Sequence, residues 1–170
     1  MPYKIINGTL NVELVPKSAW GKNLRSELSS SEWDWIKKTV SKHANHVCEV
    51  CGGVGDRWPV ECHEKWFYDK DTKTQILKGF IALCPTCHQA KHIGLAIKNG
   101  YEHNVIKHIM KVNEWNRQTT MNHIEEQFNI WKSRNKIQWS LDTSYVDKAL
   151  ALRDESLLDK RLQKDAYVTF

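Results

Sequence analysis

Two cysteine pairs are the residues of this sequence best suited to binding a metal ion. Cys48 and Cys51 are separated by two residues, and Cys84 and Cys87 repeat this spacing further along the chain. Four thiolates from two such pairs suit a tetrahedral zinc ion, and a site closed by four cysteines is structural because it leaves no open position for chemistry. The alternatives are a redox-active pair, which would need a βαβ context that is missing here, and four core cysteines without a metal.

Histidines and carboxylates form a second group that could bind a metal ion and transfer protons. The run Glu61-Cys62-His63-Glu64 lies at one end of a predicted strand, and His88 and His92 are four residues apart on a predicted helix. This spacing places both imidazoles on one helical face, where they can share a metal ion. A divalent ion there would polarise a phosphodiester, and a neutral His63 could take a proton from the attacking water.

Each of these residues also has a simpler interpretation. His92 could be an exposed surface residue, and His88 could extend or replace a ligand of the cysteine site. Cys62 could pack as a small apolar residue, since free cysteine behaves in this way in protein cores.

The elements that must hold these groups are predicted from hydrophobic periodicity and turn residues. Strands at 60–67 and 75–83, joined by the polar segment 69–73, form a hairpin that brings the two cysteine pairs together. A helix begins near Pro85, a residue suited to a first turn, and runs to Lys98 before Asn99-Gly100 ends it. This helix carries His88 and His92.

The flanking segments are predicted to be a hairpin followed by helices. Residues 3–6 and 9–12 flank Asn7-Gly8, a favoured two-residue turn, and residues 16–30 are irregular or form short helices. A capping box formed by Ser31 and Asp34 predicts a helix over 31–44. Helices at 101–114 and 119–134 follow, then a short link at 139–141 and a charged helical segment at 143–164.

The composition is that of a globular protein. The 170 residues are 41% apolar and 26% charged, with a net charge of +5 that is compatible with a phosphate-rich partner. No stretch approaches the ~20 apolar residues that cross a bilayer, and the first residues lack the apolar run of a signal peptide. We therefore expect a cytoplasmic protein without membrane contact, whose five cysteines favour metal binding over disulfides.

Three motifs in this order resemble the HNH endonuclease family in its four-cysteine, zinc-bearing form, of bacterial or phage type. They are Cys48-Glu-Val-Cys51-Gly, Pro59-Val-Glu-Cys-His63-Glu-Lys-Trp66 and Leu83-Cys-Pro-Thr-Cys-His88-Gln-Ala-Lys-His92. The resemblance covers residues 46–98 and implies an α+β fold with a ββα-metal core. We expect an N-terminal hairpin and helix over 1–45, the HNH core over 46–100 and a C-terminal helical extension over 101–170.

The resemblance also implies roles for individual residues. His63 matches the general base, His88 and His92 match ligands of the catalytic metal, and the four cysteines match a structural zinc site. The second metal would be a divalent ion such as Mg²⁺, Mn²⁺, Ni²⁺ or Zn²⁺. The implied function is metal-dependent hydrolysis of phosphodiester bonds in DNA.

Two departures from the family pattern bear on the metal. Cys62 stands where many members have Asp or His as a ligand, and Gly79 stands where many have Asn. A ligand set of Cys62, His88 and His92 would favour zinc or another transition metal over Mg²⁺, with Glu61 or Glu64 as an oxygen ligand. On a regular strand Cys62 and Glu64 share one face, and Glu61 and His63 share the other, but a bulge or the end of the strand could change this arrangement.

Nucleic-acid contacts are expected close to these motifs. Lys65, Trp66 and Lys91 lie beside the histidines, and Trp58 and Trp66 flank the run 61–64, where they could line a substrate groove. The alternative function is a catalytically inactive, zinc-stabilised module on the HNH fold that binds nucleic acid or protein. The mixed charge of the C-terminal helix favours docking to a protein partner or a second copy of the chain.

Overall fold

The fold is built around a long β-hairpin, as seen in a computed structural model that describes residues 9–158. Strands β1 (Glu61–Asp69) and β2 (Thr74–Leu83) pair antiparallel, and the short strand β3 (Ser140–Asp142) pairs parallel to β2 at its start. The resulting sheet has the order β1-β2-β3. The chain is therefore α+β, with residues from its last third completing the sheet.

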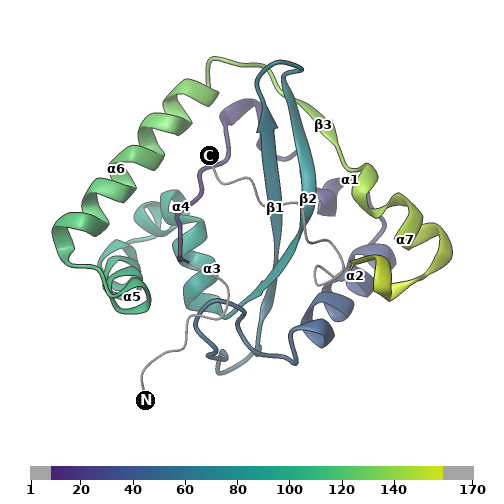
Figure 1. The fold of residues 1–170 in the computed structure, drawn as a ribbon, viewed down its shortest axis with the longest axis horizontal. Helices are drawn as coiled ribbons and strands as arrows, with labels where there is room; N and C mark the ends of the chain where they lie inside the picture. The colour runs from purple at the N-terminus through teal and green to yellow at the C-terminus, as the bar shows by residue number, and fades with distance from the viewer. Residues whose placement is uncertain (1–8, 159–170) are drawn as a thin grey trace.

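Helices cover both sides of this hairpin (Figure 1). Those on one side are α3 (Pro85–Lys91), α4 (Ile93–Lys98), α5 (Glu102–Asn113) and α6 (Arg117–Arg134). Those on the other side are α1 (Leu24–Glu27), α2 (Ser30–His43) and α7 (Asp147–Leu152). Short 3₁₀ turns complete the description: η1 (Lys17–Ala19), η2 (Ser144–Val146) and η3 (Glu155–Leu158). Among the described residues, no helix combines the length and the apolar character needed to cross a membrane.

Two hydrophobic cores follow from the alternation of β2. Successive strand residues point to opposite faces of a sheet. Ile81 and Leu83 belong to the core that contains the four paired cysteines and the apolar faces of α3 to α6. Phe80 and Ala82 belong to the core beneath α2 and α7. The sheet is thus buried on both faces, which holds β1 between two helical layers.

Several predicted elements are confirmed to within two residues at each end. The structure has the strands expected at 60–67 and 75–83, and the helices expected at 31–44, 101–114 and 119–134. The capping box of α2 is formed by Ser29 and Glu32, two residues before the predicted pair of Ser31 and Asp34. The reason is that α2 starts at Ser30, so Ser31 already lies inside the helix.

The second strand of the predicted N-terminal hairpin, at 9–12, is wrong. The first strand, at 3–6, lies outside the described residues. Residues 9–12 form no strand. The side chain of Asn113 instead bonds both the N–H and the carbonyl of Leu10, and His123 accepts a hydrogen bond from the N–H of Val12. These side chains satisfy the backbone groups that a partner strand would have paired.

Three other predictions are corrected. The helix expected over 85–98 is divided at His92, whose φ of −98° and ψ of 47° leave the helical range, just before Gly94 weakens the helix. The link at 139–141 contributes to β3, beside the buried Trp139. The segment 143–164 is interrupted where Arg153 adopts a left-handed conformation, and its residues after 158 lie outside the description.

A bulge in the hairpin explains why glycine occupies position 79. Lys65 pairs with Gly79 and Trp66 pairs with Leu77, so Lys78 has no partner residue in β1. Gly79 has a φ of +149°, a conformation that favours glycine, and a Cβ there would lie 3.6 Å from the hydroxyl of Tyr145. Glycine at this position therefore meets a local backbone requirement.

Candidate functional site

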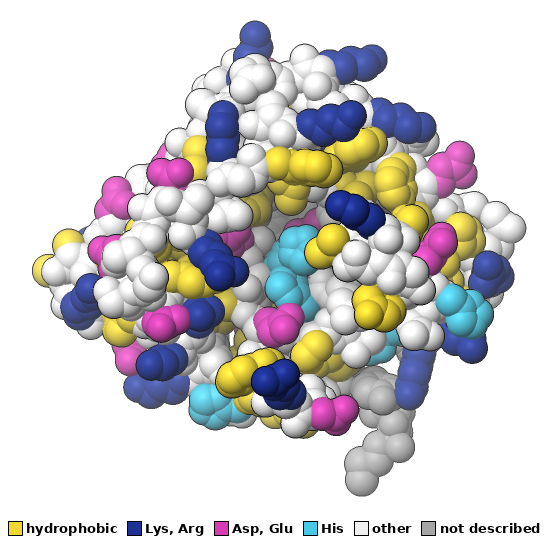
Figure 2. Space-filling model, turned by 180° about the vertical axis from the view of Figure 1, so that it is seen from behind, with side chains coloured by type: hydrophobic (Ala, Val, Ile, Leu, Met, Phe, Trp, Pro, Cys, Tyr) yellow, Lys and Arg dark blue, Asp and Glu magenta, His cyan; other side chains and the backbone are white. Residues whose placement is uncertain are grey.

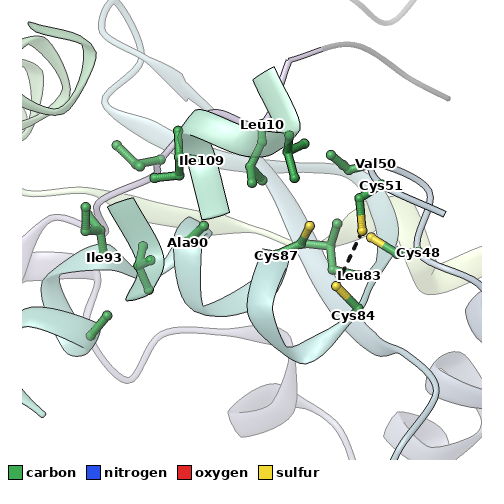
Figure 3. Packing of buried hydrophobic residues seen from close by; sticks show 14 of the residues in the cluster. Leu10, Cys48, Val50, Cys51, Leu83, Cys84, Cys87, Ala90, Ile93 and Ile109 are labelled. Carbon is green, nitrogen blue, oxygen red and sulfur yellow. Dashed lines mark hydrogen bonds between the residues drawn. The ribbon is translucent and has the colours of Figure 1, made fainter. Parts of the chain in front are cut away.

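The four paired cysteines converge on one buried point at the end of the hairpin (Figure 3). Cys48 and Cys51 lie on a tight turn closed by hydrogen bonds from Gly52 N–H to the Cys48 carbonyl and from Cys48 N–H to the Gly53 carbonyl. Cys84 follows β2 directly, and Cys87 lies in the first turn of α3. The hairpin between the pairs therefore returns the chain to its starting point, as the sequence predicted.

The spacing of the sulfur atoms fits a metal ion. The Sγ atoms of Cys51 and Cys84 are 3.7 Å apart, and all four sulfurs lie within 4.8 Å of one another. Thiolates at about 2.3 Å from a shared tetrahedral zinc would be about 3.8 Å apart. Mutual contacts lower the pKa of Cys48 and raise the pKa of Cys87, so four thiolates would form together only around a cation. The cluster could hold a metal ion.

The three histidines of the predicted site also converge. His63 comes from β1, and His88 and His92 come from α3 and its C-terminal end. One ring nitrogen of each lies within 4.8 Å of the others. The Nε2 atoms of His88 and His92 are 3.1 Å apart. Two nitrogens bound to one metal ion at about 2.1 Å would lie about 3.0–3.4 Å apart, so this pair fits a shared ion.

Glu61 completes the environment of His88. Its Oε2 atom accepts a hydrogen bond from Nδ1 of His88, which leaves Nε2 of that ring with an available lone pair. A carboxylate behind a metal-binding imidazole fixes the ring and increases its basicity. Burial lowers the pKa of His88, against the opposing effect of Glu61. Burial, with the neighbouring His63 and His88, lowers the pKa of His92 to about 3, so both rings are neutral at neutral pH and could bind a cation.

Glu13 holds His63 from the opposite side. Its carboxylate lies 2.8 Å from Nε2 of His63 and 2.7 Å from Nζ of Lys91. The backbone N–H of Glu13 donates to the carbonyl of Lys91, which anchors the N-terminal segment on α3. Burial raises the pKa of Glu13, but Lys91 and His63 lower it more, and the group is ionised at neutral pH.

Cys62 and Glu64 lie on the other face of β1 and do not join the histidines. Cys62 packs against the core beneath α2, so the expected ligand set of Cys62, His88 and His92 is not assembled. Glu64 accepts hydrogen bonds from the backbone N–H of Leu24 and from Nε1 of Trp66. The cause is the regular alternation of β1, which places Glu61 and His63 on one face and their neighbours on the other.

Two of the expected nucleic-acid contacts have other surroundings. Lys91 is only 8% exposed, and its ammonium pairs with the carboxylate of Glu13. It therefore lies beneath the surface and contacts the residue that holds His63. Trp66 packs against the core beneath α2. Lys65 is half-buried, and burial lowers the pKa of its ammonium.

A groove on the α2 side has Glu61 in its lining. Its lining includes Arg25, Trp33, Lys37 and the exposed Trp58, together with Glu61 and Cys62. Trp58 lines this groove, whereas Trp66 is not among its lining residues. Figure 2 shows the molecule from behind, with histidine side chains in a central hollow and acidic and basic side chains around this hollow.

Sequence reasoning missed Glu13 and the contact of His108 with the cysteine cluster. Nε2 of His108 lies 3.1 Å from the Cys87 sulfur, where an imidazole N–H can donate to a thiolate. Glu13 is 50 residues from His63 in the chain, so no local spacing links them. Nothing in the sequence around Glu13 assigned it a chemical role.

No protein-family model matches the chain, and neither a curated protein nor a solved structure matches it significantly. The arrangement of the two clusters is therefore the basis for assigning a function.

Proposed function

We propose that this protein is a metal-dependent endonuclease of the HNH type that hydrolyses phosphodiester bonds in DNA. The observation that carries the proposal is the convergence of His63, His88 and His92 beside a separate four-cysteine cluster. In this proposal β1, β2 and α3 form the ββα-metal unit, and the cysteines hold a structural zinc ion. The order of these residues in the chain supports the proposal, because it is the order of the HNH motifs.

The histidines have distinct roles in the proposed reaction. His88 and His92 would hold a divalent cation, which polarises the scissile phosphate and stabilises the leaving oxygen when bound. His63 would accept the proton of the attacking water, a role that suits an imidazole near neutral pH. Glu61 would orient His88 through its hydrogen bond. Desolvation lowers the pKa of His88 and of His92, which favours the neutral forms that can bind a cation.

A supercoiled-plasmid assay tests the proposal. Wild-type protein would be treated with chelator, its remaining zinc counted, and then supplied separately with Mg²⁺, Mn²⁺, Ni²⁺ or Zn²⁺. We expect nicked or linear DNA with at least one ion. His63→Ala should reduce the rate by about 10²–10⁴-fold, the usual contribution of a general base. His103→Ala, an exposed histidine on α5, is the matched control.

Metal affinity separates the two roles that His63 could have. As a general base, His63 can be removed with little change in the affinity of the site, whereas His88→Ala should weaken it strongly. An equal loss of affinity in both variants would make His63 a third ligand. Absence of cleavage of any DNA or RNA with every ion would contradict the nuclease proposal.

The second candidate is a zinc-stabilised module that binds nucleic acid or protein without turnover. The orientation of Cys62 favours it, because the position where the HNH motif has a further metal ligand faces away from the histidines. Saturable DNA binding by a protein that holds one zinc and never cleaves would favour this candidate.

A further inference from the structure

We infer that Glu13 is a positioning residue that keeps His63 in the Nε2–H tautomer, so that Nδ1 is the nitrogen able to accept a proton or bind a cation. This inference rests on the proposed function for its catalytic meaning. Its structural content, the tautomer of one ring, can be measured without any reaction.

The hydrogen-bond donors around Glu13 determine the tautomer. An ionised carboxylate accepts hydrogen bonds and cannot donate one. Glu13 Oε2 lies 2.8 Å from Nε2 of His63, so that nitrogen must carry the proton. Lys91 Nζ donates to the other oxygen, Oε1, at 2.7 Å, and Lys91 is itself buried. Both carboxylate oxygens are thus engaged, and the cation of Lys91 favours the ionised form of Glu13.

The fold holds Glu13 in place through its own backbone and through the backbone of the residues before it. Asn113 bonds Leu10, His123 bonds Val12, and the N–H of Glu13 bonds the carbonyl of Lys91. The side chain of Glu13 is therefore already ordered before His63 acts. We expect this arrangement of a group that orients a general base, because no conformational entropy is then lost when the base acts.

Glutamine at position 13 should reverse the tautomer although it has nearly the same shape as glutamate. An amide offers one oxygen, and the Lys91 ammonium, which can only donate, would bind that oxygen. The amide NH₂ would then face Nε2 of His63, which must accept and so lose its proton. The proton would move to Nδ1, and the ring would present the wrong nitrogen, the effect seen when a triad carboxylate is replaced by its amide.

Nuclear magnetic resonance of ¹⁵N-histidine-labelled protein tests this directly. The sample would hold zinc in the cysteine cluster and no metal at the histidines, as verified by elemental analysis. Above the titration of His63, we expect a protonated Nε2 in the wild type and a protonated Nδ1 in Glu13→Gln. Adding Lys91→Met to Glu13→Gln should restore the Nε2–H form, because the amide oxygen becomes available to His63.

Control variants and activity distinguish this role from a loss of structure. Glu64→Gln, on the other face of β1, should leave the His63 tautomer unchanged. Glu13→Gln should lower kcat far more than it changes KM, and Glu13→Asp should recover part of the loss. A wild-type ring protonated at Nδ1, or no change in Glu13→Gln with an intact amide spectrum, would overturn the inference. If the predicted tautomers are found in a protein that cleaves no nucleic acid, the inference about Glu13 is supported and the nuclease proposal fails.

Discussion

At the scale of single residues, the histidine cluster is organised by carboxylates behind its rings. His88 is bonded by Glu61 and His63 by Glu13, each through one ring nitrogen. The second nitrogen of His88 faces His92, with the two Nε2 atoms 3.1 Å apart. This resembles the general construction of metal sites, where a hydrogen-bonded carboxylate orients an imidazole ligand. The two carboxylates come from different elements, so the cluster depends on β1 and on the N-terminal segment together.

The role of Glu61 leads to a prediction about metal affinity. Glu61→Gln removes the charge behind His88 and should weaken metal binding at the histidine cluster about 10-fold, since replacing such groups typically costs about 10–100-fold. Calorimetric titration of zinc-loaded protein with Ni²⁺ would measure the change. Glu64→Gln is the matched control because Glu64 lies on the other face of β1. Equal affinities in both variants would show that Glu61 does not support His88 as a ligand.

At the scale of elements, the N-terminal segment is held by side chains of the helical layer. Both oxygen and nitrogen of the Asn113 side chain bond the backbone of Leu10, although the two residues are 103 positions apart. Leu10 and Val12 are buried in the same core as the cysteines. This segment carries Glu13, so its attachment to α5 and α6 bears directly on the orientation of His63.

Asn113→Ala should therefore destabilise the protein and loosen the site. Two hydrogen bonds to backbone are lost and their partners at Leu10 stay buried, which predicts a decrease of about 1–3 kcal/mol in the free energy of unfolding. Urea denaturation would measure it, with Asn104→Ala, an exposed residue on the same helix, as control. Faster hydrogen exchange at Leu10 and Val12 is expected in Asn113→Ala alone. Unchanged stability and exchange would mean that packing alone holds the segment.

At the scale of the whole molecule, the cysteine cluster connects the hairpin to the helical layer. The paired cysteines are part of the core formed by α3 to α6, and Cys87 also contacts His108 of α5. A bound metal ion would stabilise the folded state by its full binding free energy, since the unfolded chain holds no preformed site. Its loss would leave four thiols crowded in a buried position.

Removing one cysteine ligand should consequently unfold much of the protein. We expect Cys84→Ser to lose the bound zinc and its cooperative thermal transition, as measured by circular dichroism and elemental analysis. Cys62→Ser is the matched control, because Cys62 lies outside the cluster, and it should retain one structural zinc per chain. A stable, cooperative Cys84→Ser protein without zinc would show that the fold does not depend on the metal.

Part of the fold and site could be predicted because it depends on local spacing. Two pairs of cysteines that flank a hairpin must meet at its open end, and histidines four residues apart share a helical face. The alternation of β1 was predictable in the same way. It determines which of Glu61 and Glu64 accompanies the histidines, although the sequence alone did not exclude a bulge that would have changed the choice.

Contacts between distant segments were decided only by the tertiary structure. The pairing of Glu13 with His63, the bonds of Asn113 to Leu10 and the addition of β3 to the sheet join residues 50 or more positions apart. No periodicity encodes such pairs, because they arise when independently formed elements pack and satisfy one another's polar groups. From the sequence alone came the types and local spacing of the metal-binding residues. Packing determined that Glu13 stands behind His63 and that Asn113 holds the segment that carries it.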